Sequence, residues 1–426
     1  MQKAEKIIQT ERLSDLGLRT IRELETDNGI LASSRQEIFG CIFGRDSLIT
    51  SLHLLQAYRK TKNEYLIGVV KKIILNLAEL QGQEENIESG EEPGKCIHEF
   101  RPDNHAHLTS RSEKPWYLYP DKIMRNYDSV DSTPLFLIAL YRYYQISGDT
   151  ETIQRLVPNA RDAVTWLFKY GDSNLDGLID YQFRPERTYG GLITQNWMDS
   201  GEALFHEDGS EVRYPVAPVE VQAYAYLALR LWAPYLEGID PEQSYYMKQR
   251  AQQLWVLFND KFKMPDGGLA SGIDGDDRQL TAVRSSIGHT LWAALDPELD
   301  GSLDCIVEES FIPKIVDRLM KEDLFEPHAG IRTLSAGSAK FNPRSYHNGS
   351  IWPHDNAMIA RGLENYGYTR EAELIRLSMR WAIAQFKTPL ELFVYSNGSY
   401  EEYRSATGQG PCPKQAWTAA ALLAEL

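Results

Sequence analysis

The sequence predicts an all-α fold, an (α/α)6 toroid of about twelve helices arranged in six pairs. Three observations support this prediction. Helical segments recur in pairs, in which the first member is apolar nearly all round and the second has one apolar stripe and one charged face. No series of segments shows the period-two alternation typical of β-strands. No linker rich in Pro, Gly or Ser divides the chain, so residues 1–426 are expected to form a single domain.

The first helix is expected over residues 3–24, where apolar residues recur with a roughly helical period before the turn signal Asp27-Asn28-Gly29. The remaining helices are expected at about 44–59, 64–83, 130–146, 150–169, 217–236, 241–261, 285–295, 303–320, 355–366, 368–387 and 413–426. Short strands are expected only within the loops, for example over Leu178–Phe183. The first and last helices complete the sixth pair.

The two kinds of helix differ clearly at 223–229 and 246–250. The segment Ala-Tyr-Ala-Tyr-Leu-Ala-Leu at 223–229 is apolar throughout, which predicts a buried inner helix. Tyr-Met-Lys-Gln-Arg at 246–250 belongs to an amphipathic outer helix. The long loops, such as residues 84–128, follow outer helices and precede inner ones. We therefore expect them to meet at one end of the toroid and to build the functional site there.

Composition narrows the class of ligand. The chain has 42% hydrophobic and 25% charged residues, as ordinary globular proteins do, and a net charge of −15 without a basic stripe. This argues against a nucleic-acid or membrane partner. The 9 Trp and 23 Tyr could stack on sugar rings, although they could equally belong to the core. A carbohydrate partner is therefore favoured, and the oligomeric state is left open.

Cysteine usage and the N-terminus indicate an intracellular protein. Cys41, Cys96, Cys305 and Cys412 are scattered without metal-ligand spacing, so buried reduced thiols are expected and no metal is predicted. The N-terminal segment begins a charged amphipathic helix and has no apolar signal region, and no apolar run is long enough to cross a membrane. We expect a cytoplasmic protein that needs no cofactor.

The acidic residue that the loops point to most strongly is Asp199, in Asn196-Trp197-Met198-Asp199-Ser200. Apolar neighbours can raise the pKa of such a carboxyl group and make it a proton donor. The alternative from this segment alone is a loop Asp that caps the next turn. An acidic helix entrance, Pro218-Val219-Glu220-Val221-Gln222, follows some twenty residues later.

Other loops carry a similar mixture of acids, aromatic residues and His. Arg45 and Asp46 begin one helix, where either hydrogen bonding to vicinal hydroxyl groups or an N-cap with a solvated Arg would explain them. Asp128 and Asp131 stand at the entrance of another helix, where capping accounts for one of them and leaves the other free. His98 and Glu99 are adjacent, which excludes a shared metal face on a helix. The segment 346–355 interleaves aromatic residues with His and Asn and could form a sugar platform. Glu391, flanked by apolar residues, could be a general base or an edge residue, and Glu401-Glu402 follow it.

The segment Asp172-Ser173-Asn174-Leu175-Asp176-Gly177 matches the start of a calcium-binding loop. The Glu expected at the twelfth position is absent, because Phe183 stands there, so a tight Asx-type turn is the favoured interpretation and calcium a minor one. No GxSxG, phosphate-binding or HExxH motif occurs in the sequence. Two opposed carboxylates acting on a glycosidic bond are the reaction class that remains.

Five of these segments together resemble the amylo-α-1,6-glucosidase module of glycogen debranching enzymes. They are residues 44–47, 129–133, 196–200 with 218–222, 346–353 and 413–417, in the order of that family and over about residues 36–420. The resemblance implies an (α/α)6 barrel and an inverting hydrolase that releases terminal glucose. It also implies that Asp199 is the general acid and Glu391 the general base, although this chain has Pro-Leu-Glu where the family has Leu-Pro-Glu. Glu401 and Glu402 are the reserve candidates for the base.

The resemblance further implies a sugar subsite, lined by Arg45, Asp46, Asp131, Trp197, Glu220, His347, Asn348 and Trp352. Inversion requires about 6.5–9.5 Å between the two carboxyl groups. Neutral invertases and the hydrolases of glucosylglycerate or mannosylglycerate share the fold and similar motifs, and are the closest alternatives. A glycan-binding barrel without catalysis, or an epimerase or lyase of the same shape, is the alternative from another class.

Overall fold

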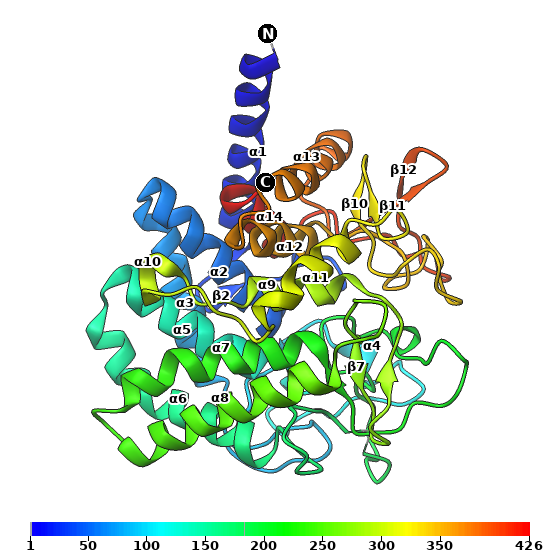
Figure 1. Cartoon of the computed structure of the whole chain (residues 1–426). Coiled ribbons are helices and arrows are strands. Elements are labelled where there is room, and N and C mark those ends of the chain that lie inside the picture. Colours follow the sequence, from blue (N-terminus) through cyan, green and yellow to red (C-terminus); the bar gives the residue numbers. More distant parts are fainter. Residues whose placement is uncertain (1, 183) are drawn as a thin grey trace.

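The computed structural model describes residues 2–182 and 184–426, with side chains from Leu13 onward. Six helices form a closed inner ring in the described chain, each in contact with the next and the last in contact with the first (Figure 1). In ring order these are α2 (Gly44–Thr61), α5 (Ser132–Ser147), α7 (Val219–Leu236), α9 (His289–Trp292), α12 (Pro353–Asn365) and α14 (Ala416–Ala424).

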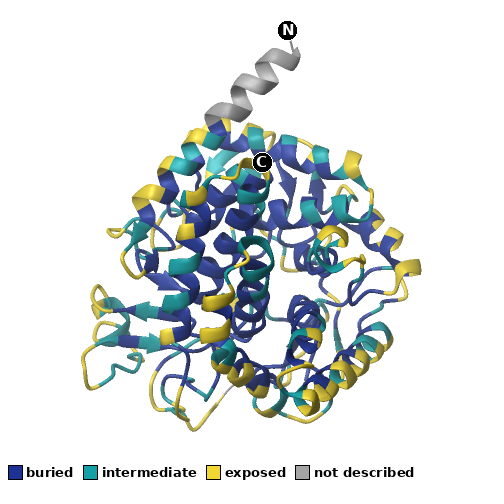
Figure 2. Ribbon diagram, turned by 90° about the vertical axis from the view of Figure 1, so that its left-hand side faces the viewer, coloured by how far each residue is buried: buried dark blue, intermediate teal, exposed yellow. Residues whose placement is uncertain are grey.

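Six further helices surround the ring: α1 (Gln2–Leu24), α3 (Glu64–Glu79), α6 (Thr150–Lys169), α8 (Pro241–Lys261), α11 (Ile312–Leu319) and α13 (Thr369–Phe386). Five of them pack on their inner partners, α11 packs on the 3-10 turn that leads into α9, and the pairing of α1 with α14 joins the two ends of the chain. Exposed residues lie on the outward faces of the outer helices, while the inner helices are largely buried (Figure 2). The predicted (α/α)6 architecture is confirmed.

The short links from inner to outer helices explain why each outer helix begins where it does. Asn63, Asp149 and Asp240 stand directly before α3, α6 and α8, and each side chain accepts a hydrogen bond from a backbone N–H of the first turn at 3.0–3.2 Å. Such N-caps satisfy donors that have no partner inside the helix. The long connections run from outer to inner helices, as predicted.

The fifth pair was predicted wrongly. Instead of helices over 285–295 and 303–320, a 3-10 turn at Ser285–Gly288 leads into the four residues of α9. A link over 293–311 then contains only α10 (Pro297–Asp300) and a 3-10 turn at Glu309–Phe311 before α11. Asp296 caps α10, and Arg59 on α2 holds the same carboxylate at 2.5 Å. Cys305, Ile306 and Val307, which fall within the helix expected over 303–320, are buried in a segment without regular secondary structure.

The loop end of the ring carries small antiparallel sheets. Their strands are β1 (Glu25–Thr26) with β2 (Gly29–Ile30), β3 (Ile42–Phe43) with β4 (Glu99–Arg101) and β5 (Met124–Asn126), β6 (Ala217–Pro218) with β7 (Gly272–Ile273) and β8 (Gln279–Leu280), β9 (Phe325–Glu326) with β10 (Gly330–Ile331), and β11 (Phe393–Ser396) with β12 (Ser399–Glu402). A short helix, α4 (Ala106–Thr109), lies between β4 and β5. Of the strand expected over Leu178–Phe183, only Tyr181 pairs, with Val216; Phe183 lies outside the described residues.

The segment that matches the start of a calcium loop forms an Asx turn. Asn174 and Asp176 accept hydrogen bonds from backbone N–H groups two residues further on, at 3.2 and 2.8 Å. Asp172 pairs with the guanidinium of Arg250 at 2.5 Å. A protein cation therefore already lies against the carboxylate that a calcium ion would need, which supports the interpretation as a turn.

All four cysteines are buried free thiols, as expected. Among the described helices, none combines the length and the apolar character that crossing a membrane would require.

Candidate active site

Arg45 joins three parts of the chain at the loop end of the ring. It lies in the first turn of α2, and its Nε donates to Asp131 Oδ2 at 2.7 Å. Its two other nitrogens donate to Asp199 Oδ2 and to the carbonyl oxygen of Asn196, both at 3.1 Å. The side chains of Arg45 and Asp131 are at most 4% exposed, whereas that of Asp199 is 26% exposed. Asp199 is therefore the member of this network that can meet a substrate.

Glu391 lies between α13 and β11, with both carboxylate oxygens held. Oε1 accepts a short hydrogen bond from the hydroxyl group of Tyr346, and Oε2 accepts one from the backbone N–H of Cys412 at 2.9 Å. Asp46, next to Arg45, accepts a hydrogen bond from Gln415 at 3.4 Å. Glu391 and Asp46 are buried, and ordered donors fix the orientation of the Glu391 carboxylate.

Burial raises the pKa of all three carboxyl groups. The pKa of Asp199 rises to about 6, although the guanidinium of Arg45 opposes the increase. That of Glu391 rises to about 7, against the hydrogen bonds from Tyr346 and Cys412, and that of Asp46 to about 7 against Arg45. The charge of Asp199 raises the pKa of both Glu391 and Asp46. The three groups are thus coupled, and near neutral pH at least one of them holds a proton.

A cluster of aromatic rings contacts the segment that carries Asp199. The ring of His347 stacks on Trp352 at 5.1 Å, and Trp197 meets both rings edge-on at 5.7 and 5.8 Å. His347 Nδ1 lies 2.9 Å from the hydroxyl group of Ser200, beside Asp199 in the chain. Burial holds the pKa of His347 well below its usual value, so this ring is neutral. The aromatic cluster therefore positions the segment that carries Asp199.

Glu220 contacts the segment that carries Asp199 through the side chain of Asn196. It is fully buried at the start of α7, and its Oε1 accepts a hydrogen bond from the Asn196 side chain at 2.7 Å. Its other oxygen has no hydrogen-bond partner in the described structure. Burial raises the pKa of Glu220 to about 7.

Glu220→Gln is expected to stabilise the protein at pH 8. A carboxyl group whose pKa is raised by folding favours the folded state at low pH and loses that contribution as the pH rises from about 4 to about 7. Gln can still accept from Asn196 and carries no charge to bury. The expected gain is at most about 3 kcal/mol at pH 8, and near zero at pH 4. Urea unfolding of both proteins at the two pH values measures it, and an equal effect at both would refute the explanation.

A family model for the mannosylglycerate hydrolase MGH1-like glycoside hydrolase domain matches residues 107–418. The chain belongs to this family. The match includes Asp131, Asp199, Glu220 and Glu391 and leaves out Arg45 and Asp46. The protein is therefore a glycoside hydrolase, as the sequence predicted, although the model describes a family other than the amylo-α-1,6-glucosidases. No curated protein matches the chain.

Solved structures show the same fold as this MGH1-like domain. The GH63 mannosylglycerate hydrolase from Thermus thermophilus in complex with Tris superposes with a TM-score of 0.64 at 14% identity, over 96% of this chain and 99% of that one. The same enzyme has been solved in complex with Tris and D-glycerate. A rhamnosidase from Klebsiella oxytoca with rhamnose bound gives a TM-score of 0.58 at 14% identity, over 97% of this chain and 63% of that one.

The fold brings most of the predicted site residues together, Arg45 from before the matched segment and the others from within it. Arg45, Asp131 and Asp199 are in direct contact, and Glu220 joins them through Asn196. The two reserve candidates for the base lie elsewhere, on the hairpin strand β12. Glu401 forms an ion pair with Arg344 at 2.6 Å, and Glu402 is exposed and pairs with Arg404 at 2.9 Å. No group of three or more His, Cys, Asp or Glu among the described residues is arranged to hold a metal ion.

Arg284 is a supporting residue of the MGH1-like site that the sequence analysis missed. It is buried directly before the 3-10 turn that leads into α9, and donates to the carbonyl oxygen of His347 and to the Asn348 side chain, both at 2.9 Å. It therefore fixes two predicted sugar-binding residues. The only local signal was an Arg at the entrance of an inner helix, a position similar to that of Arg45 at the start of α2.

Proposed function

We propose that the chain hydrolyses a small glycoside of glycerate, mannosylglycerate or glucosylglycerate, with inversion at the anomeric carbon. The family match over residues 107–418 carries this proposal. The Thermus thermophilus enzyme of similar fold is a mannosylglycerate hydrolase solved with D-glycerate. The alternative stated from the sequence thus has more support than release of glucose from a branched glucan.

In the proposed mechanism Asp199 is the general acid. Its side chain is partly exposed and its raised pKa favours the protonated form that must donate to the glycosidic oxygen. Arg45 holds one oxygen, Oδ2, which leaves Oδ1 to carry the proton. As the bond to the leaving group breaks, the proton moves to the departing oxygen, and the carboxylate that remains is stabilised by the guanidinium.

Glu391 is the proposed general base. It would take a proton from a water molecule that attacks the anomeric carbon on the face opposite Asp199. The hydrogen bonds from Tyr346 and Cys412 stabilise the ionised form that a base requires, against the effect of burial. Because both oxygens are held, the carboxylate keeps one orientation, which favours a fixed position for the attacking water.

The test of this function is sugar release from mannosylglycerate, glucosylglycerate, sucrose, isomaltose and limit dextrin, with the first-formed anomer followed by NMR. We expect cleavage of a glycerate glycoside and a product anomer inverted relative to the substrate. Cleavage of limit dextrin and isomaltose alone would support the debranching alternative. A retained anomer would reject the assignment of Glu391 as a base.

The pH dependence of hydrolysis should be bell-shaped. The productive form has Asp199 protonated and Glu391 ionised. Because the pKa of Glu391, about 7, lies above that of Asp199, about 6, the proton shared by the coupled pair resides more often on Glu391, and the productive form is the minor of the two singly protonated forms. Below pH of about 6 both groups are protonated and the base is lost, and above about 7 both are ionised and the acid is lost. The maximum of kcat/KM is therefore expected between these two values. A rate that still increases from pH 7 to 9 would contradict this assignment.

A further inference from the structure

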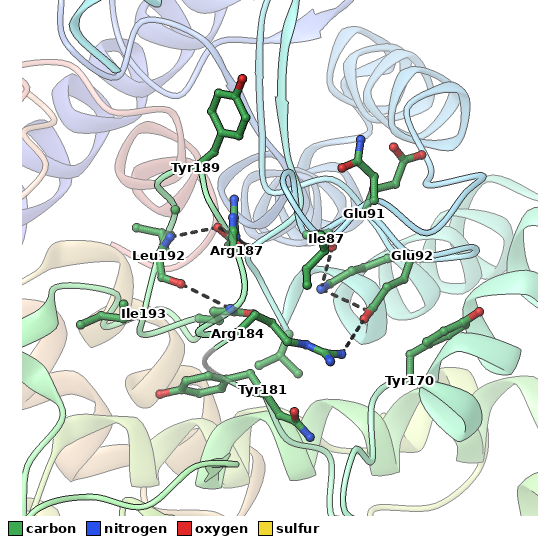
Figure 3. A pocket seen from close by; sticks show the side chains of 18 of the residues that line it. Ile87, Glu91, Glu92, Tyr170, Tyr181, Arg184, Arg187, Tyr189, Leu192 and Ile193 are labelled. Atoms are coloured by element: carbon green, nitrogen blue, oxygen red, sulfur yellow. Dashed lines mark hydrogen bonds and ion pairs between the residues drawn. The ribbon is translucent and has the colours of Figure 1, made fainter. Parts of the chain in front are cut away.

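A cavity of about 500 Å³ lies beside the carboxylate cluster, and none of the three members of that cluster, Asp199, Glu391 and Asp46, lines it. Figure 3 shows residues that do line it, among them Glu92, Tyr181 and Arg184. Its walls come from two connections of the ring, the one between α3 and α5 and the one between α6 and α7, together with Trp166 on α6. The volume is typical of sites for small ligands and is sufficient for two or three sugar units.

Two segments of the chain form the wall between the cavity and the cluster. Asp128 and Gln195 line the cavity, whereas Asp131 and the carbonyl of Asn196, further along the same two segments, contact Arg45. A backbone hydrogen bond of 2.9 Å from Val130 to Gln195 joins the two segments. Asp128 also accepts from the backbone N–H of Leu192 at 2.9 Å and pairs with Arg187 at 2.8 Å. The wall is therefore braced, and the cavity forms a compartment that Asp199, Glu391 and Asp46 do not line.

Aromatic side chains from both connections and from α6 face this compartment. They are Trp116, Trp166, Tyr170, Tyr181 and Tyr189. At Gly190 a Cβ atom would come within 2.7 Å of the Trp116 ring, so only glycine lets the loop approach this ring so closely. Flat rings with polar edges are suited to the apolar faces of sugars.

Both acidic and basic side chains line the compartment among the aromatic rings. Glu92 accepts from the indole N–H of Trp166 at 2.8 Å, and Lys95 lies 3.4 Å from the same carboxylate. Arg184 is about half exposed and approaches Glu92 only to 3.9 Å, too far for a hydrogen bond, so its donors can reach a ligand. Asp180 is buried in the wall, and its carboxylate accepts from Ser173 at 2.5 Å. Donors and acceptors thus lie side by side.

The charges that line the compartment nearly cancel, since five acidic and four basic side chains contribute. A strongly anionic or cationic ligand would therefore meet several side chains of its own sign. A neutral ligand with many hydroxyl groups can instead use both the acidic acceptors and the basic donors. We infer that this compartment binds a neutral di- or trisaccharide, as a second carbohydrate site independent of hydrolysis.

The inference is tested on the whole chain carrying Asp199→Asn, with mannobiose and isomaltose as probes. Binding is followed through the indole N–H resonances of Trp116, in the compartment, and Trp197, beside the carboxylate cluster. We expect the Trp116 signal to shift saturably with one of the probes. Arg184→Ala should weaken this binding about tenfold, as the loss of a hydrogen bond to a charged group does, without changing the curve from Trp197.

Two controls make the test decisive. Arg155→Ala removes an exposed arginine from the outer helix α6, outside the compartment, and should leave both curves unchanged. Arg184→Ala in the otherwise native chain should leave kcat/KM within about twofold, since Arg184 has no contact with the cluster. No shift of Trp116 with either probe, or an equal effect of the two arginine variants, would overturn the inference. A large fall in kcat/KM would also overturn it, because the compartment would then belong to the catalytic cleft. Since the readout is binding, the inference can hold even if none of the glycosides in the hydrolysis panel is cleaved.

Discussion

Glu391→Gln is expected to lower kcat by about 10²- to 10⁴-fold, the range that general acid–base groups contribute. Gln keeps the size of the side chain: its oxygen can accept from the backbone N–H of Cys412 and its NH2 group can donate to the hydroxyl oxygen of Tyr346, but it cannot take a proton from water. The fold should therefore persist while the reaction stops. Initial rates on the substrate identified from the panel, together with an unchanged midpoint of urea unfolding, measure this effect.

The controls for Glu391 come from the same region of the chain. Glu401→Gln and Glu402→Gln each remove one carboxylate of strand β12, the partner of Arg344 or of Arg404. Each variant should retain activity within about twofold. If Glu391→Gln kept more than about a tenth of the native rate while Glu401→Gln were inactive, the base would have to be reassigned.

The leaving group separates the two catalytic roles. An aryl glycoside with an acidic phenol departs without protonation, so Asp199→Asn should recover much of its lost rate on such a substrate. Glu391→Gln should not recover, because water still has to be deprotonated. The same response in both variants would contradict the assigned roles.

Asp131→Asn should produce the largest loss of stability. Asp131 is fully buried and is held by Arg45 at 2.7 Å and by the hydroxyl group of Ser129 at 2.6 Å. With Asn in its place, the buried guanidinium of Arg45 keeps contact with one carboxylate, that of Asp199, and with the carbonyl oxygen of Asn196. Removing one partner of a buried ion pair costs about 3–5 kcal/mol. Urea unfolding at pH 7 measures the difference in the free energy of unfolding.

The same substitution should also impair catalysis. Arg45 would then depend on Asp199 for its neutralisation, which would lower the pKa of the proposed acid and shift the alkaline limb of the pH profile to lower pH. Glu402→Gln is the matched control, because its exposed pair is worth less than about 1 kcal/mol. A loss for Asp131→Asn no greater than that of this control would show that the buried pair does not stabilise the fold.

The ring could be predicted from the sequence because the inner helices are apolar nearly all round, whereas the outer helices have one apolar stripe and one charged face. The prediction failed at residues 285–320. There, Arg59 on α2 pairs with Asp296 and Arg142 on α5 pairs with Asp300, so contacts distant in sequence hold the link against the inner helices. Glu391, Glu401 and Glu402 likewise look alike in sequence, and only the fold buries the first and exposes the last. Arg284 has only a weak local signal, since its partners His347 and Asn348 lie more than 60 residues further along the chain.

The closure of the ring between α2 and α14 has a kinetic consequence. Asp46 and Gln415, which meet at this seam, are 369 residues apart in the chain, and Arg45 and Asp199 are 154 apart. Helices and adjacent pairs form from local contacts and can form early, whereas contacts across such long separations form late, because the loop-closure entropy must be overcome first. During refolding, helical circular dichroism should therefore return before hydrolytic activity. An intermediate with most of its helices but an open seam would have no assembled catalytic site.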